Sequence, residues 1–529
     1  MGMARIAQKE VDMRITNKIM QNNNLANINT NKLLQDRLST QMSTEKKINR
    51  PSDDPVVAIR ALRLRANVAE VTQYYSRNIP DAESWLNVTE EAVKNLASIV
   101  TEMQKQCTKG ADGKIKSSDR QIVIEQLKAL ADEVYSTADA DYAGRYVFTG
   151  YRTDTSVSFR EATKKQYSIT EQLTKDNIDQ ITFINTKANG DDVMDMTVNN
   201  YQDIDVAKED IQPVEVYRFH LAYGSCDDVP TNAVPPRLSL TYGAQQTGSI
   251  PIEVKHDYES PYEAAAAATG EKAIFVPETG EVLLSKDAYD TLMKTKDDTT
   301  TADENEGEIR ITYEKSNWVK GDLRPEHYFA CVSDKGTDNE LAYNQDYLSG
   351  NVERQDIEYD VGFNQTIRIN STADECFKHS ISREVEDLVN AMQDVVDTEK
   401  IVEDLNGLLE KATGADAKEI QKKLDVAQKV LELKKDKAQR MFEHGITQMQ
   451  GHLDETNVSL TNIGTRSKKL ELIENRMQSQ KTTFEELQSV NEDIDIAEVI
   501  INLTSAKLTY EVSLMATGKV AQTSLLQYI

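Results

Sequence analysis

The stretch Val68–Met103, VAEVTQYYSRNIPDAESWLNVTEEAVKNLASIVTEM, decides the fold of the first part of the chain. Its apolar residues recur at helical spacing, which predicts one long amphipathic helix of the coiled-coil kind. Pro80 lies inside this stretch and should kink the helix. A further helix is expected from Ser117, with Ser117 or Ser118 as its cap. The stripe of the long helix consists of Val68, Val71, Tyr75, Ile79, Ala82, Leu86, Val93, Leu96, Val100 and Met103.

The end of the chain repeats this helical pattern from Ser380 onward, with one predicted interruption at residues 406–419, NGLLEKATGADAKE. No proline occurs after Pro325, and apolar residues keep a near-heptad step that continues after a phase shift. Both ends therefore carry apolar stripes that need a partner, so we expect them to pack against each other. The C-terminal stripe consists of Ile463, Leu470, Ile473, Met477, Phe484 and Leu487, then Ile494, Val499, Leu503, Ala506 and Tyr510.

The middle of the chain has the alternating pattern of β-strands, in runs such as PVEVYRFHLAY, RLSLTYG, SIPIEVKH, EIRITYEK and DIEYDVGFNQTIRIN. IFVPETGEVLLS, residues 274–285, predicts a hairpin that turns at Glu278–Gly280. The predicted fold class is therefore α+β and multidomain. A long, coiled-coil-like helical rod is formed by both chain ends, and a β-rich domain is inserted between them.

Composition excludes several classes of function. The 529 residues carry a formal charge of −27, which repels nucleic acid and anionic membrane surfaces. The four cysteines are far apart and form no CxxC pair, so no structural zinc site or disulfide-rich scaffold is indicated. The N-terminus has no apolar signal-peptide core, and no run of about 18 apolar residues could cross a membrane.

A search for catalytic and cofactor motifs finds no GxGxxG, GxxxxGK[ST], GxSxG or HExxH. Cys376 and His379 are spaced like half of a metal site but lack a second half. Asp303, Asn305 and Glu314 resemble a calcium loop, yet the glycine is misplaced, so a solvated acidic loop is the preferred interpretation. The sequence therefore predicts no enzyme, no cofactor and no metal.

The stretch INRPSDDPVVAIRALRLRA, Ile48–Ala66, predicts a corner between two helices. Pro51 disfavours helical angles before it, and Pro55 suits a first helical position. Ser52, Asp53 or Asp54 can accept hydrogen bonds from the exposed N–H groups of the helix that follows. The alternative, an acid–base or metal pair, has no histidine or third carboxylate nearby in the sequence. Capping is the preferred role.

Three arginines, Arg60, Arg63 and Arg65, follow this corner and could suggest a phosphate site. In so acidic a chain they are better candidates for ion pairs with its own carboxylates, within one subunit or between subunits. They cannot all share one helical face, so some should point toward neighbours.

The same motifs resemble the hook-associated protein 3 family, the hook–filament junction proteins of the bacterial flagellin superfamily. The paired prolines and RALRLR are more similar to the junction proteins than to flagellin, which typically has an Asp-Asp-Ala-Ala-Gly run at this corner. The motifs that carry the resemblance are MRITNKIM from Met13, INRPSDDPVVAIRALRLRA, GRYVFTGYRTDT from Gly144, DVGFNQTIRINSTADECF, NIGTRSKKLELIENRM, and residues 493–529 ending in SLLQYI.

The resemblance implies a structural flagellar protein with no enzymatic activity. Such proteins are exported unfolded by the type III apparatus without a cleaved signal peptide, bind an export chaperone, and polymerise at the hook tip as a ring. The implied partners are the hook-side junction protein, flagellin subunits and further copies of the chain, outside the cell. A flagellin-like filament subunit is the alternative.

The expected organisation follows from this resemblance and from the sequence pattern. The terminal segments should be mobile in the monomer and become helical on assembly, because each lacks a partner in its own subunit. The expected parts are 1–50 as the N-terminal segment, 51–155 and 358–485 as the rod, 156–357 as the outer β-rich domain, and 486–529 as the C-terminal assembly helix.

The C-terminal tail has an apolar face that nothing near it in sequence covers, and we expect the export chaperone and then neighbouring subunits to cover it. The residues on this face are Leu503, Leu508, Val512, Met515, Val520, Leu525 and Leu526.

Overall fold

The computed structural model describes residues 17–228, 237–243, 246–294, 308–349 and 355–526. These fall into two compact units. The first combines the described residues up to Pro80 with Asp360–Gln365 and those from Glu471 onward. The second combines the described residues of Asp81–Tyr359 with Thr366–Leu470. The predicted fold class is confirmed, since helices occupy both ends and strands fill the middle.

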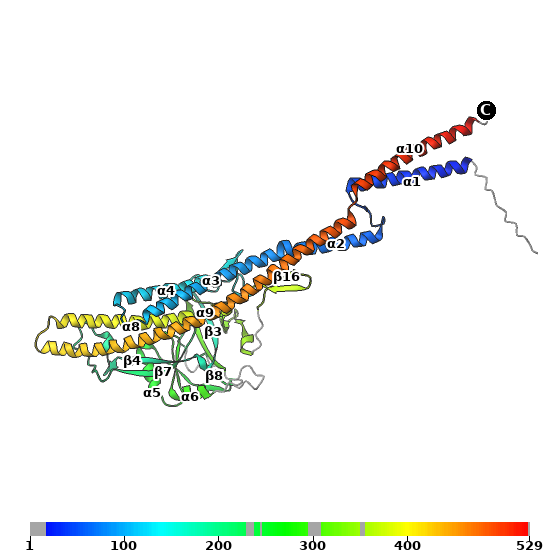
Figure 1. Cartoon of the computed structure of the whole chain (residues 1–529). Coiled ribbons are helices and arrows are strands. Elements are labelled where there is room, and N and C mark those ends of the chain that lie inside the picture. The colour runs from blue at the N-terminus through cyan, green and yellow to red at the C-terminus, as the bar shows by residue number, and fades with distance from the viewer. Residues whose placement is uncertain (1–16, 229–236, 244–245, 295–307, 350–354, 527–529) are drawn as a thin grey trace, which may run out of the picture. The chain divides into compact units, whose positions relative to one another are not determined.

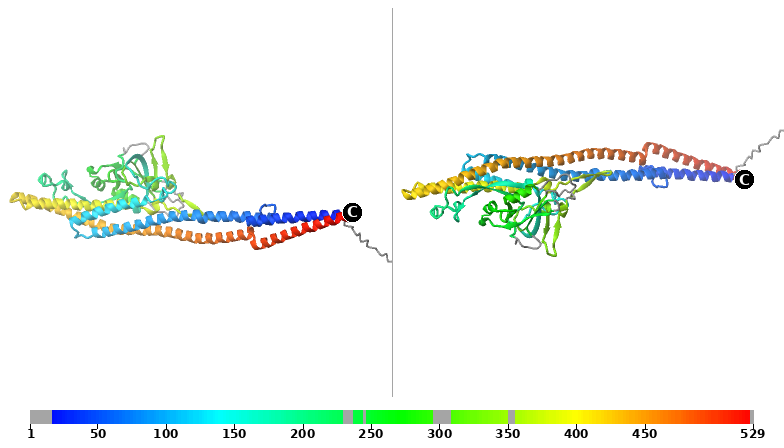
Figure 2. Two further views of the ribbon diagram at one scale, coloured as in Figure 1. Left: turned by 90° about the horizontal axis from the view of Figure 1, so that it is seen from above. Right: turned by 90° about the horizontal axis from the view of Figure 1, so that it is seen from below.

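In the first unit, α1 (Asn17–Thr44) lies beside α10 (Ile496–Leu526), as Figures 1 and 2 show. The two helices share a small apolar core of Leu38, Val499, Leu503 and Ala506. The predicted pairing of the two chain ends is therefore present.

The helix that begins at the corner is α2 (Pro55–Gln73), and α3 (Ile79–Gly110) continues it. Between them lies one π-helical turn, Tyr74–Asn78. The sequence predicted a kink at Pro80, but the irregular turn comes directly before it. Because proline has no N–H and its ring crowds the preceding turn, the altered hydrogen bonding falls on those residues.

The long helices described in the second unit are α3, α4 (Ser117–Ala138), α8 (Ser380–Leu409) and the first part of α9 (Ala415–Glu492). The stripe predicted along α3 is buried from Ile79 to Met103. The predicted interruption is confirmed, because α8 ends before Gly414, which has φ +73°. The predicted cap of α4 is wrong. Lys116 is the N-cap residue and has no side-chain hydrogen bond there, since the helix starts at Ser117 itself.

The phase shift in the C-terminal pattern marks a break. The helix α9 ends at Glu492, and α10 begins at Ile496. The Asp495 carboxylate accepts hydrogen bonds from the backbone N–H groups of Ala497 and Glu498, at 2.9 and 3.2 Å, and so caps α10. The two apolar stripes thus belong to two helices rather than to one.

The β-rich part of the second unit contains two main sheets, of five and six strands. All pairings are antiparallel except that between β10 and β11. The five-stranded sheet has the order β10 (Ile252–Val254), β11 (Ala273–Val276), β12 (Glu281–Leu284), β7 (Gln212–His220), β4 (Ile178–Asn185). The six-stranded sheet has the order β15 (Leu341–Tyr343), β14 (Ala330–Ser333), β3 (Thr163–Leu173), β13 (Ile309–Trp318), β8 (Ser239–Tyr242), β9 (Gly248–Ile250).

Smaller elements complete the chain. They are β1 (Asp141–Tyr142), β2 (Arg145–Tyr146), β5 (Lys187–Ala188), β6 (Asp191–Asp192), α5 (Pro261–Ala267), α6 (Lys286–Lys294), α7 (Ala373–Cys376), and the hairpin of β16 (Glu358–Gly362) and β17 (Gln365–Arg368).

The predicted hairpin is confirmed, because β11 pairs with β12 around residues 277–280. Gly280 is required there. It has φ +69°, and a Cβ atom on it would lie 2.0 Å from the carbonyl oxygen of Tyr223.

The β-rich part covers one side of the helices of its unit (Figure 2). Part of this contact is an apolar cluster between the segment after β4 and the helices α8 and α9. It contains Ile184, Val193, Met196, Ile204, Val206, Ile211, Ile401, Leu405, Leu424, Val426, Ala427 and Val430.

Candidate functional site

At the corner formed by residues 45–54, the carboxylates of Asp53 and Asp54 accept hydrogen bonds from backbone N–H groups. The Asp54 carboxylate accepts hydrogen bonds from the backbone N–H groups of Val56 and Val57, at 3.0 and 3.1 Å, and Pro55 is the first helical residue. The Asp53 carboxylate turns the other way and accepts from the N–H groups of Arg50 and Asn49, at 2.9 and 3.2 Å. The bond from the Arg50 N–H lowers the pKa of Asp53. Pro51 and Ser52 form the exposed turn between Arg50 and Asp53, and the Asp53 N–H closes this turn by donating to the Arg50 carbonyl at 2.9 Å.

Both acceptors are satisfied by backbone N–H groups, so we expect the double substitution Asp53→Asn and Asp54→Asn to change the free energy of unfolding by less than about 1 kcal/mol, because asparagine caps nearly as well. Asp54→Ala, which keeps no acceptor, should cost about 1 kcal/mol. Thermal unfolding followed by circular dichroism measures both. Micromolar calcium or zinc binding by calorimetry, lost in the double Asn variant, would instead show a metal site.

The three arginines behind the corner have different surroundings. The Arg65 guanidinium binds both carboxylate oxygens of Glu492, with Nε–Oε1 and Nη2–Oε2 distances of 2.8 and 2.5 Å. The Arg60 and Arg63 side chains are exposed, and within the described part of the chain neither forms an ion pair.

Glu492 also ties the corner to the break between α9 and α10, a role that the sequence pattern did not reveal. The Lys46 ammonium binds Asp493, and the backbone N–H of Lys47 donates to the Glu492 carbonyl at 2.7 Å. The Lys47 ammonium donates to the Val490 carbonyl. These partners are more than 400 residues apart in sequence, so periodicity within either segment cannot indicate them.

Outward-facing apolar side chains are frequent on α1 and α10. Leu508, Val512 and Met515, predicted on the tail face, are 55–69% exposed. Leu503, predicted on the same face, is buried against α1 instead, because the pairing of the ends covers that row. The side chains of Val520, Leu525 and Leu526 lie outside the described residues. The other large exposed apolar residues of these helices are Ile19, Met20, Leu25, Leu33, Leu34, Met42, Ile496, Ile500, Ile501 and Leu514.

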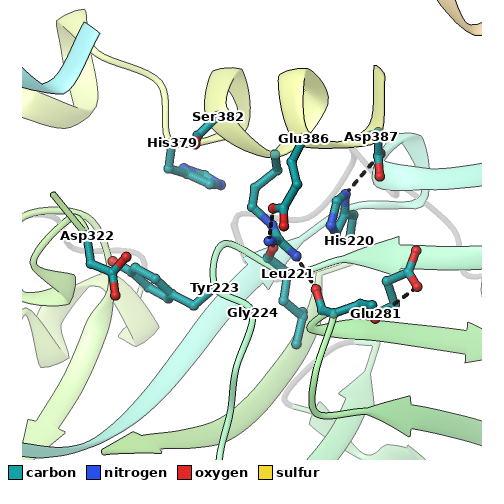
Figure 3. Close-up of polar contacts among 12 residues, drawn as sticks. His220, Leu221, Tyr223, Gly224, Glu281, Asp322, His379, Ser382, Glu386 and Asp387 are labelled. Carbon is teal, nitrogen blue, oxygen red and sulfur yellow. Dashed lines mark hydrogen bonds and ion pairs between the residues drawn. The ribbon is translucent and has the colours of Figure 1, made fainter. Parts of the chain in front are cut away.

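A buried polar cluster joins the five-stranded sheet to α8 within the second unit. Arg218 on β7 binds Glu281 of β12 and Asp387 of α8. His220 Nδ1 lies 3.2 Å from Asp387 Oδ2, and Figure 3 shows these two side chains facing each other. Burial alone would raise the pKa of Asp387, but the charge of Arg218 outweighs it and holds that pKa well below the usual range.

Arg383, one turn before Asp387, also links the five-stranded sheet to α8. Its Nε donates to the Leu221 carbonyl at 3.1 Å, and its Nη2 donates to the Thr279 carbonyl in the β11–β12 turn. Nη1 binds Glu386 at 2.5 Å. Arg383 and Asp387 thus hold the end of β7 and the β11–β12 turn, and Arg218 links β7 to Glu281 of β12. We call Arg383, Asp387, Arg218, His220 and Glu281 the sheet–helix joint.

Two histidines, His327, which is buried, and His379, which is half-buried, make the second unit sensitive to acid. Burial lowers the pKa of each to about 4. Between pH 6.5 and 4 these histidines are protonated in the unfolded chain but stay neutral in the folded one. The free energy of unfolding therefore falls as the pH falls. Burial raises the pKa of Glu171 to about 7, which acts in the opposite direction.

We expect His379→Gln to remove part of this acid sensitivity. Between pH 6.5 and 4.5 the unaltered chain should lose roughly 2 kcal/mol more than the variant in the free energy of unfolding, measured in urea at both pH values. His444→Gln is the matched control, because His444 is exposed and should not alter the loss. Equal losses in all three proteins would contradict this expectation.

Within the described residues, no group of three His, Cys, Asp or Glu side chains is placed to hold a metal ion. Asp303 and Asn305 of the calcium-like loop lie outside those residues, and the Glu314 carboxylate is bound by Arg237 and Gln166. Burial raises the pKa of the Cys376 thiol to about 12, so it is not a ready thiolate ligand. No described helix is long and apolar enough to cross a membrane.

Comparison with known proteins finds flagellar proteins among the relatives of this sequence. Residues 15–153 match the model of the bacterial flagellin N-terminal helical region. Flagellar hook-associated protein 3 of Salmonella typhimurium is 28% identical over 167 residues, which are 30% of this chain and 52% of that protein. The protein of the same name from Escherichia coli is 26% identical over 190 residues, 36% of this chain and 59% of that protein. The chain thus spans between half and three fifths of the length of these relatives.

Solved structures of similar description also match. A putative flagellar hook-associated protein from Vibrio parahaemolyticus has a TM-score of 0.33 at 12% identity, covering 83% of this chain and 99% of that one. Hook-associated protein 3 from Legionella pneumophila has a TM-score of 0.28 at 11% identity, covering 81% and 98%. The sequence matches to the flagellin model and to hook-associated protein 3 confirm the resemblance indicated by the motifs.

Proposed function

We propose that this chain, which resembles hook-associated protein 3 of the flagellin superfamily, is the structural subunit that connects the hook of a bacterial flagellum to its filament. The observation that carries the proposal is the pair of matches to hook-associated protein 3, together with the flagellin-like helical region at residues 15–153. The role is mechanical and involves no catalytic step.

The terminal helices are the proposed assembly elements. Their outward apolar side chains would be costly to leave in water, and neighbouring subunits can cover them at about 25 cal/mol per Å² of apolar surface removed. In this proposal the terminal segments 1–50 and 486–529 assemble, 51–155 and 358–485 form the rod, and 156–357 faces outward.

The same apolar surface supports the proposed route to the site of assembly. An exposed apolar tail in the cytosol would favour aggregation, so an export chaperone covers it until the unfolded chain passes through the type III apparatus. Outside the cell, copies form a ring at the hook tip and contact the hook-side junction protein and flagellin.

A flagellin-like filament subunit is the second candidate, because the family model that matches residues 15–153 describes flagellin itself. The two candidates differ in the phenotype of a deletion strain. Loss of a junction subunit should leave bare hooks and intact flagellin in the medium, whereas loss of the filament subunit should leave no flagellin of this kind at all. Normal filaments in the deletion strain would contradict both.

The proposed mobility of the ends gives a prediction for the isolated monomer. The shared core of α1 and α10 is small, so its helices should open often in a dilute monomer. We expect roughly the first 40 and last 40 residues to exchange amide hydrogens within seconds, and the second unit to be protected. Mass-spectrometric hydrogen exchange measures this. Slow exchange that continues through α10 would show that the ends are ordered without neighbours.

A further inference from the structure

The outer face of α2 carries apolar and basic side chains that are not packed or paired within its own unit. Val56, Ile59 and Leu62 are 55–64% exposed and lie within two turns of one another. Arg60 and Arg63 follow Val56 and Ile59 by four residues each and so lie on the same side of the helix, and neither forms an ion pair within the described residues. We call these five residues the α2 face.

The inner side of α2 is already occupied. Ala58 and Ala61 are buried, and the Asn491 side chain donates to the Val57 carbonyl at 3.3 Å. Arg65 is held by Glu492. The α2 face therefore points away from the packing that holds the helix in its unit, and its apolar side chains and guanidinium groups are open to another molecule.

A face of opposite charge lies on the outside of α4. Ile122 is 53% exposed, and on the same side of the helix lie the exposed carboxylates of Asp119, Glu125, Asp132 and Glu133. Within the described residues, these carboxylates form no ion pair. We call Ile122 with these four residues the α4 face. Each face thus combines exposed aliphatic surface with charge of one sign, and the signs are complementary.

We propose that the α2 face of one copy of this chain binds the α4 face of another copy. Arg60 and Arg63 pair with the carboxylates of the α4 face, while Ile59 and Leu62 pack against Ile122. The partner is a second copy because an acidic chain of charge −27 repels nucleic acid and anionic lipid but offers the required carboxylates itself. The contact is head-to-tail, since the two faces differ, and such contacts build rings or helical arrays.

The inference rests on the proposed function and names one of its subunit contacts. We would measure self-association of the purified full-length chain by sedimentation velocity. The double variant Arg60→Glu and Arg63→Glu should weaken it at least about tenfold. Changing all four carboxylates of the α4 face to arginine in the same chain should restore the affinity, because every charged contact then has reversed signs. The control variant Arg77→Glu with Lys418→Glu makes the same change in net charge at exposed positions outside both faces and should leave association unchanged.

A second measurement does not depend on charge. A chain with Arg63→Cys and Glu133→Cys should form disulfide-linked dimers and longer chains on mild oxidation, and neither single-cysteine variant should form longer chains. The inference is overturned if the unaltered chain does not self-associate, if charge reversal changes the affinity less than about twofold, or if the second reversal does not restore it. It is also overturned if the cysteine pair fails to cross-link.

These outcomes are separable from those of the proposed function. If a deletion strain keeps normal filaments, the junction role fails whatever the purified chain does. If the deletion strain sheds flagellin as expected, but the Arg60→Glu and Arg63→Glu variant associates normally and restores motility, only the α2–α4 contact fails.

Discussion

Replacing Asp387 by alanine should destabilise the second unit by about 3 kcal/mol at pH 7, because it leaves Arg218 buried with one of its two close carboxylate partners missing. Removing one member of a buried ionic cluster costs more than the cluster itself contributes, since the remaining charge has lost its compensation. Both tryptophans of the chain, Trp85 and Trp318, lie in this unit. Urea unfolding followed by tryptophan fluorescence therefore reports the change directly.

The matched control for this prediction is Glu403→Ala, which removes an exposed carboxylate from the same helix. It should change the free energy of unfolding by less than about 0.5 kcal/mol. If Asp387→Ala has as small an effect as the control, the sheet–helix joint does not hold the β-rich part in place.

Removing residues 520–529 should abolish incorporation at the hook tip while leaving the second unit folded. The tail combines few charges with a row of aliphatic side chains, and burial of four of these by neighbouring subunits is worth on the order of 6 kcal/mol before ordering costs. That is enough to dominate a weak subunit contact. The truncated chain should fail to restore filaments in a deletion strain, and its affinity for the export chaperone should fall.

A conservative variant separates apolar burial from length. Val520→Ile with Leu525→Ile and Leu526→Ile keeps the apolar surface and should support assembly. Normal motility with the truncated chain, at normal expression, would show that the tail is not an assembly element. Failure of the conservative variant alone would show that shape, rather than apolar burial, decides the contact.

Much of the fold could be predicted from the sequence because its signals are local. The stripe from Val68 to Met103, the break before Gly414 and the hairpin at residues 277–280 each depend on neighbours within a few residues. The Asp54 cap has the same origin, since its acceptor and donors are two and three residues apart.

The sheet–helix joint and the Arg65–Glu492 pair could not be predicted in this way. Arg218 and Asp387 are 169 residues apart, and Arg65 and Glu492 are 427 apart. Their pairing depends on how β7 and α8, or α2 and α9, come together. The sequence suggested that the arginines would find carboxylates of the same chain, but which carboxylate depends on the tertiary fold. The burial of Leu503 could not be predicted for the same reason, because the residues that cover it belong to α1.

The central claim is that this chain sits between hook and filament, and its position on intact flagella tests that most directly. Antibodies raised against the purified chain, detected by gold labelling in electron micrographs of detached flagella, should mark one narrow band at the hook–filament boundary. Labelling along the whole filament would assign the chain to the filament instead, and flagella that carry no label would remove it from the structure altogether.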